Sequence, residues 1–227
     1  MSEQDMSNEQ IREAASASMA SGENIRERVR ALTLQALQSR RLDFSAMREV
    51  MTSLTQGISL GAERRGQDVR QALSEAFAGM DQAMSKAAQA SSLALKELAA
   101  RGRDFSDNEL KQGLERMRQM EGDFLDSVRQ VSRSTSGSVK SEWQDLIAHA
   151  QRAGTDTGRV ISQTARDFSA RMTATMSEGA VAGVEAARQF GERFAALTSG
   201  VLAGMSEALR PDKDKDEDKN KNKNKKA

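Results

Sequence analysis

The stretch of sequence from Phe44 to Ala62 reads FSAMREVMTSLTQGISLGA, and its hydrophobic residues recur every three or four positions. That spacing places them along one side of an α-helix, with polar residues on the other side. The same spacing continues to Leu209 at a mean step of about 3.67 residues, which corresponds to an eleven-residue repeat. The sequence therefore predicts an all-α protein built from long amphipathic helices.

A fixed interval of 33 residues, or three such repeats, tests the periodicity without any choice of step. Two series of hydrophobic residues fall on this interval, one starting at Phe44 and one at Ala62. An eleven-residue repeat keeps such a face nearly straight, so we expect an antiparallel bundle or an extended, coiled-coil-like array. The residues predicted to form this continuous interaction face are Phe44, Ala62, Phe77, Leu95, Leu110, Val128, Trp143, Ile161, Met176, Phe194 and Leu209.

Composition divides the chain into three regions. Residues 1–42 are predicted to be an N-terminal helical segment, and residues 43–210 a long amphipathic helical region. Breaks are expected near residues 102–105 and 154–155, where glycine lies beside helix-capping residues. The spacing alone leaves open whether these sites are turns or continuous helix. Residues 211–227 are rich in Lys, Asp and Asn without a hydrophobic residue before the last position, so this tail is predicted to be disordered.

The N-terminal segment carries its own start and stop signals. Ser7 and Gln10 have the spacing of a capping box, in which each side chain bonds the other residue's backbone N–H. Ser21 and Gly22 are expected to interrupt the helix that begins there. A second helix is predicted from Glu23 to Arg41, with one hydrophobic face.

Several classes of enzyme are incompatible with the composition. The chain has no Cys and a single His, which excludes disulfides, thiolate metal sites and a Cys nucleophile. No two glycines are separated by one residue, so a Gly-x-Gly phosphate loop is absent from the sequence. His149 lies between alanines without a second His or a carboxylate cluster. We therefore expect no catalytic, cofactor-binding or metal-binding residues and no enzymatic activity.

Small residues recur every fourth position toward the C-terminus. Glycines four apart let two helix backbones approach closely, which indicates a helix–helix seam. The alternative is that the helices merely tolerate glycine, at a cost of about 1 kcal/mol each. The residues predicted to form the seam are Gly179, Gly183, Ala187, Gly191, Gly200 and Gly204.

The charges argue against specific nucleic-acid binding. Positive and negative residues nearly balance, and the arginines of residues 1–210 are interleaved with acidic residues. The Lys-rich tail would supply only a weak, salt-sensitive attraction to polyanions. No secretory signal is visible and no hydrophobic run reaches the roughly 20 residues of a membrane span. We expect a cytoplasmic protein.

The segment Val184 to Leu209, VEAARQFGERFAALTSGVLAGMSEAL, resembles phasins, which coat polyhydroxyalkanoate granules. The eleven-residue spacing is similar to that of exchangeable apolipoproteins, perilipins and synucleins. The phasin resemblance implies a non-enzymatic surface coat in the cytoplasm; another bacterial family of amphipathic helices is the alternative.

Two functions remain compatible with the apolar face. In the first, the helices pack on one another, within the chain, between copies as a homo-oligomer, or against another helical protein. In the second, the face lies peripherally on a granule or membrane surface. The predicted seam and the scarcity of Lys and Trp in residues 1–210 favour packing, whereas the paired methionines and the long register favour a surface.

Overall fold

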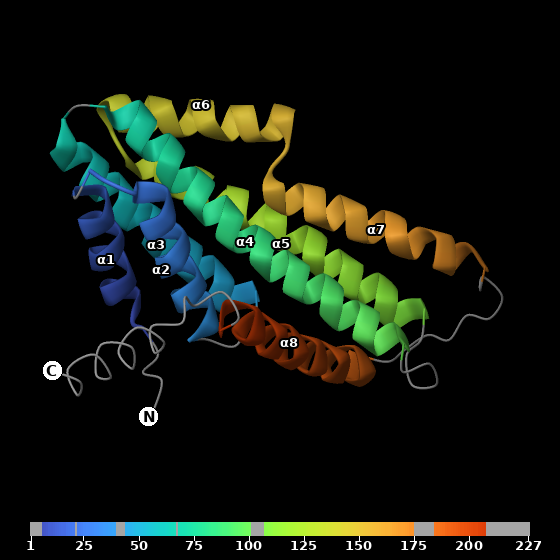
Figure 1. The fold of residues 1–227 in the computed structure, drawn as a ribbon. Coiled ribbons are helices and arrows are strands. Elements are labelled where there is room, and N and C mark those ends of the chain that lie inside the picture. The colour runs from blue at the N-terminus through green and yellow to red at the C-terminus, as the bar shows by residue number, and fades with distance from the viewer. Residues whose placement is uncertain are drawn as a thin grey trace, which may run out of the picture.

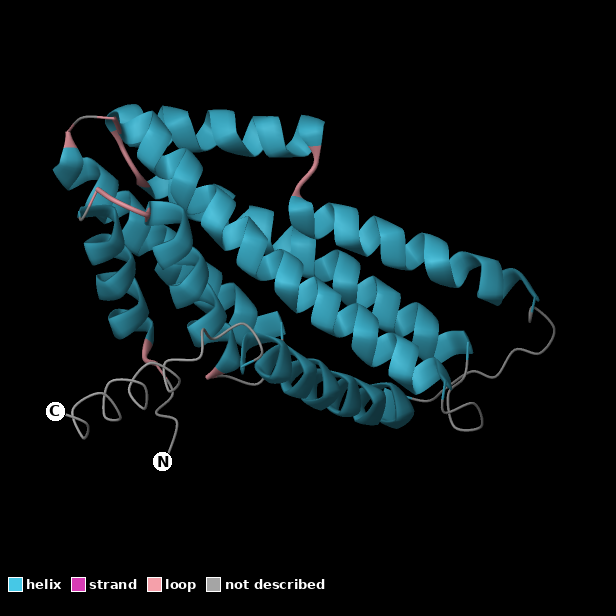
Figure 2. Ribbon diagram, in the orientation of Figure 1, coloured by secondary structure: helices cyan, strands magenta, loops and turns pink. Residues whose placement is uncertain are grey.

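In the computed structural model, residues 6–20, 22–39, 44–66, 68–100, 107–174 and 184–207 are described, and they form helices joined by short loops (Figure 2). No strand occurs in these ranges, which confirms the predicted all-α class for them. Their helices are α1 (Asn8–Ala20), α2 (Ile25–Gln38), α3 (Phe44–Arg65), α4 (Val69–Ala100), α5 (Asp107–Ser134), α6 (Gly137–Ala153), α7 (Asp156–Ala174) and α8 (Val184–Glu207).

The start of α1 confirms the predicted capping box. The Ser7 backbone N–H donates to Gln10 Oε1 at 2.8 Å, and the Gln10 backbone N–H donates to Ser7 Oγ at 3.2 Å. The predicted break follows at Gly22, whose φ of 74° is a left-handed conformation. The second predicted helix runs over the narrower range of α2, and its hydrophobic face is buried.

The spacing analysis missed a turn at residues 66–68. It carried the apolar stripe through Arg65 without a break, whereas α3 ends there and α4 begins at Val69. Gly66 has a φ of 67°, a left-handed backbone conformation that ends α3, and Asp68, directly before α4, has a φ of 52°. A stripe can keep its three- or four-residue spacing across a short turn, and spacing alone therefore does not reveal one.

Other helix ends lie close to glycines. Helix α6 begins at Gly137, with a φ of 59°, and the chain turns between α6 and α7 at Gly154, with a φ of 82°. The Gly154 backbone N–H still donates to the Ala150 carbonyl at 2.8 Å, which closes the last turn of α6. The predicted break at 102–105 and the predicted disordered tail at 211–227 lie outside the described residues.

Helix α4 is the centre of the arrangement (Figure 1). It contacts α2, α3, α5, α6, α7 and α8, while α1 packs along α3. The 32 residues of α4 correspond to a length of about 48 Å at 1.5 Å per residue. Its buried positions surround the helix rather than forming one stripe, as expected for a helix enclosed by others.

Alanine and methionine make up much of the core, and buried serines and threonines lie among them. Several of these hydroxyls donate to the carbonyl four residues earlier in their own helix. They are Thr33 to Val29, Thr55 to Met51, Ser59 to Thr55, Ser91 to Ala87, Ser127 to Asp123 and Thr164 to Val160. Their hydrogen bonds therefore do not depend on contacts between helices.

Candidate interaction surface

The predicted interaction face is folded inward wherever its side chains are described. Six of its residues are at most 5% exposed and belong to one hydrophobic cluster, and Phe77 is half-buried against that cluster. The side chains of Phe44 and Leu110, and residues Met176 and Leu209 entirely, lie outside the described part. The six buried face residues are Ala62, Leu95, Val128, Trp143, Ile161 and Phe194.

Three aromatic rings join α4, α5 and α6 in this cluster. The Phe77 and Phe124 rings stack with centroids 5.4 Å apart, and Trp143 meets the edge of Phe77 at 6.5 Å. Trp143 is fully buried, and its indole Nε1–H donates to Ser59 Oγ on α3 at 2.9 Å. This bond satisfies the polar edge of the ring, so the junction is both apolar and fully hydrogen-bonded at Trp143.

Two close helix approaches depend on glycine. A Cβ atom at Gly57 would lie 2.1 Å from the Arg12 carbonyl oxygen, and one at Gly61 would lie 2.5 Å from Met19 Cβ. On the other pair of helices, a Cβ at Gly79 would lie 2.4 Å from the Arg26 carbonyl oxygen. Backbone therefore packs on backbone where α1 crosses α3 and where α2 crosses α4.

The seam predicted for residues 179–204 has a different environment. Gly200 and Gly204 are exposed on α8, and a Cβ atom at either position would meet nothing within 4 Å. Ala187 and Gly191 lie within α8, while Gly179 and Gly183 lie outside the described residues. Among the described residues, the Gly-x-x-x-Gly pair that packs against another helix of the same chain is Gly57 and Gly61. A seam on α8 that contacts another molecule stays a prediction.

Asp81 of α4 caps the N-terminus of α7, and the sequence analysis missed it. Asp81 is 7% exposed, and its carboxylate accepts hydrogen bonds from the backbone N–H groups of Asp156, at 2.7 Å, and Thr157, at 3.1 Å. The Thr157 hydroxyl donates to the same carboxylate at 2.7 Å. The carboxylate thus satisfies donors that the first turn of a helix leaves free, and it faces the positive end of the helix dipole.

Two further groups complete this junction from neighbouring positions. Thr155 Oγ1 accepts the Gly158 backbone N–H at 2.8 Å, as an N-cap residue does, and donates to Glu121 Oε1 on α5 at 2.6 Å. Helices α4, α5 and α7 are therefore tied together at one point. One signal in the sequence could have revealed this cap. Asp81 is the acidic residue within the otherwise Ala- and Met-rich stretch from Ala76 to Leu95, where a buried carboxylate requires a partner.

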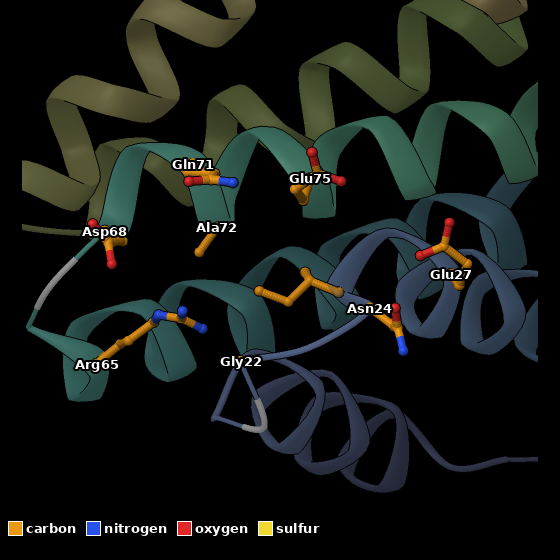
Figure 3. A pocket seen from close by; sticks show the side chains of 9 residues that line it. Gly22, Asn24, Glu27, Arg65, Asp68, Gln71, Ala72 and Glu75 are labelled. Atoms are coloured by element: carbon orange, nitrogen blue, oxygen red, sulfur yellow. The ribbon is translucent and has the colours of Figure 1, made fainter.

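A polar pocket of about 280 Å³ opens between the ends of α1–α4 (Figure 3). Arg65 lines it and donates to the carbonyl of Met19 at 3.1 Å, in the last turn of α1. Glu75 also lines it and accepts two hydrogen bonds from Arg26, at 2.8 and 3.0 Å. These charged groups form hydrogen bonds between helices, so the residues that line the pocket stabilise the packing of α1 to α4.

Replacing Arg26 with alanine is expected to lower the free energy of unfolding by less than about 1 kcal/mol. The Arg26 and Glu75 side chains are 41% and 34% exposed, so water and salt screen the pair despite its two hydrogen bonds. Urea unfolding of the wild type and the variant at low and high salt measures the difference. An effect above 2 kcal/mol that persists at high salt would contradict this assignment.

No group of three or more His, Asp or Glu residues in the described part has the arrangement of a metal site. His149 is exposed on α6. Partial burial lowers the pKa of Arg116, whereas hydrogen bonding and charge attraction from Glu9 raise the pKa of Arg12. Both shifts leave the guanidinium groups charged at neutral pH.

The described helices place the protein among all-α proteins whose amphipathic helices pack around a shared core. Over residues 1–211 the chain matches the Family of unknown function DUF6781. It belongs to that family. No curated protein and no solved structure matches it. Among the described residues, no helix combines the length and the apolarity that crossing a bilayer requires.

Proposed function

We propose that this chain is a non-catalytic helical packing protein of the cytoplasm. Its apolar face holds its own helices together, and its outer helix surface associates with a second copy or with another helical protein. The observation that carries the proposal is the burial of the face, from Ala62 on α3 to Phe194 on α8, in one cluster. A hydrophobic face that is buried against other helices of the same chain stabilises the packed fold and is not free to bind a granule or a membrane.

The proposal includes the architecture behind this burial. We propose that the eleven-residue register lets successive helices present the same face inward as an antiparallel bundle. Phe77 and Trp143 lie two intervals apart on the 33-residue series that starts at Phe44, and their rings meet in the core, which supports this assignment.

For self-association, α8 offers the candidate surface. Its described exposed positions are Glu192 and four small residues, Ala196, Gly200, Ala203 and Gly204. Small residues at this spacing suit close contact between two helices. Large apolar side chains contribute little to the described surface, where Leu60 and Leu93 are the exposed ones. A partner helix would therefore approach a surface of small and polar residues.

A coat for polyester granules or lipid, as in phasins, is the second candidate. It is favoured by the local hydrogen bonds of the buried hydroxyls, which would survive if the helices separated. Alanine contacts also contribute little apolar area each, so opening the bundle would cost less than opening a Leu-rich core. In this alternative the packed fold is a storage form, and the face becomes available on the surface.

Trp143 is the single tryptophan and reports directly on the two candidates. We expect the full chain in buffer to be helical, to melt cooperatively and to show the emission of a buried indole. Adding anionic vesicles or polyhydroxybutyrate particles should leave the emission and the helicity unchanged. Low helicity in buffer that rises sharply with either surface, together with a changed Trp143 environment, would overturn the packing proposal in favour of the coat.

Self-association is tested with the double substitution Gly200→Leu and Gly204→Leu. Because a Cβ at these positions meets nothing in the chain, the fold should persist while the light-scattering mass falls to that of one chain. Gly122→Leu is the matched control, since Gly122 is likewise exposed within a helix and free of neighbours. A wild-type mass of one chain, or loss of association in the control alone, would contradict association through α8.

A further inference from the structure

Helix α8 is attached to the rest of the fold by one side. Its inward side chains pack against the core, with Phe194 at 5% and Leu202 at 1% exposure. Its outward side is exposed at Glu192, Ala196 and Gly200. Contacts run to α4, α5 and α2, and α8 lies along the edge of the helical assembly (Figure 1). Separation of α8 would therefore uncover one interface while the contacts among the other helices remain.

Thr198 lies in the middle of this interface with an unsatisfied hydroxyl. Its side chain is 2% exposed, and within the described residues its Oγ1 is the buried side-chain oxygen or nitrogen that lacks a hydrogen-bond partner. By contrast, the hydroxyl of Thr164, which is also buried within a helix, donates to a carbonyl of its own helix. Docking α8 therefore removes the Thr198 hydroxyl from water without a compensating bond, which favours the undocked state.

A polar bond that crosses the interface does little to offset this cost. Gln38 Nε2 at the end of α2 donates to the Leu202 carbonyl at 3.4 Å, at the long limit for a hydrogen bond. Helix α8 also contains glycines at its exposed positions 200 and 204, which lower helix propensity. The apolar contacts of Phe194 and Leu202 favour the docked state.

We propose that α8 is a releasable helix, which undocks as a unit while α1–α7 stay packed, and that the unpaired Thr198 hydroxyl sets the balance between docked and undocked states. Undocking exposes the inward side of α8 together with the part of the core that it covers. The inference goes beyond the proposed function, because it concerns the isolated chain and needs no partner or surface.

Hydrogen exchange on the full chain, read by mass spectrometry of peptides from α8 and α4, tests the proposal. In the wild type, α8 amides within 192–205 should exchange at least about tenfold faster than α4 amides within 83–95, because local opening precedes global unfolding. Thr198→Val should slow exchange in α8 about tenfold and leave α4 unchanged, because the substitution removes the unsatisfied hydroxyl.

Thr164→Val is the matched control. Thr164 is also 2% exposed within a helix, but its hydroxyl donates to the Val160 carbonyl at 2.9 Å. This variant should not slow exchange in α7. Equal exchange rates for α8 and α4 in the wild type would overturn the proposal without reference to any variant. Faster exchange in α8 that Thr198→Val leaves unaltered, or that Thr164→Val reproduces, would overturn it as well.

Discussion

Gly57→Ala is expected to lower the free energy of unfolding by about 3 kcal/mol, because the added methyl group has no room between α1 and α3. Its Cβ would lie 2.1 Å from the Arg12 carbonyl oxygen and 2.9 Å from the Arg12 carbonyl carbon. Both atoms are backbone, so relief requires a movement of α1 as a whole. Urea or thermal unfolding followed by circular dichroism measures the loss.

The control makes the same Gly→Ala substitution at a position where the opposite effect on stability is expected. Gly122 lies in α5, is exposed, and a Cβ there would meet nothing within 4 Å. Gly122→Ala should therefore raise the free energy of unfolding by about 0.5–1 kcal/mol through helix propensity alone. A Gly57→Ala variant as stable as the wild type would show that α1 does not pack against α3 at this distance.

Asp81→Ala is expected to lower the free energy of unfolding by about 3 kcal/mol, the upper range for a hydrogen-bonded charged group. The change leaves the Asp156 and Thr157 backbone N–H groups and the Thr157 hydroxyl without their acceptor. It also removes the negative charge at the N-terminus of α7. Denaturant unfolding measures the loss, and hydrogen exchange should place it first in α7.

Two further variants separate the capping role from a general effect of charge. Asp81→Asn keeps one oxygen acceptor and should cost less than Asp81→Ala. The Asp126 side chain on α5 is 69% exposed and forms an ion pair with Arg129 on the same helix. Asp126→Ala should therefore cost less than about 0.5 kcal/mol. A loss for Asp126→Ala as large as that for Asp81→Ala would contradict the assigned cap.

These two predictions describe different ways of joining amphipathic helices. At Gly57 the absence of a side chain allows close van der Waals packing, and at Asp81 a buried carboxylate supplies the hydrogen bonds that a helix start lacks. Both contacts involve α3 or α4, near the middle of the fold. At Gly200 and Gly204 of the outer helix α8, by contrast, an added Cβ would meet nothing within 4 Å.

The positions of many helix ends followed from neighbouring residues. Ser7 and Gln10 satisfy each other's backbone groups within one turn, and Gly22 and Gly154 allow left-handed conformations that stop a helix. Such effects act over three or four residues and are visible in a single sequence. The turn at Gly66 escaped notice because the hydrophobic spacing continues on both sides of it.

What the sequence by itself determined is the helical class and the hydrophobic side of a helix such as α2, because both depend on local propensity and on spacing along one helix. Only the tertiary structure decided which glycines lie between helices. Gly57 and Gly61 meet α1, whereas Gly200 and Gly204 face outward with the same spacing. It likewise decided that Asp81 caps a helix 75 residues further along. The physical reason is that such contacts depend on how the turns orient whole helices, and no rule confined to four residues contains that information.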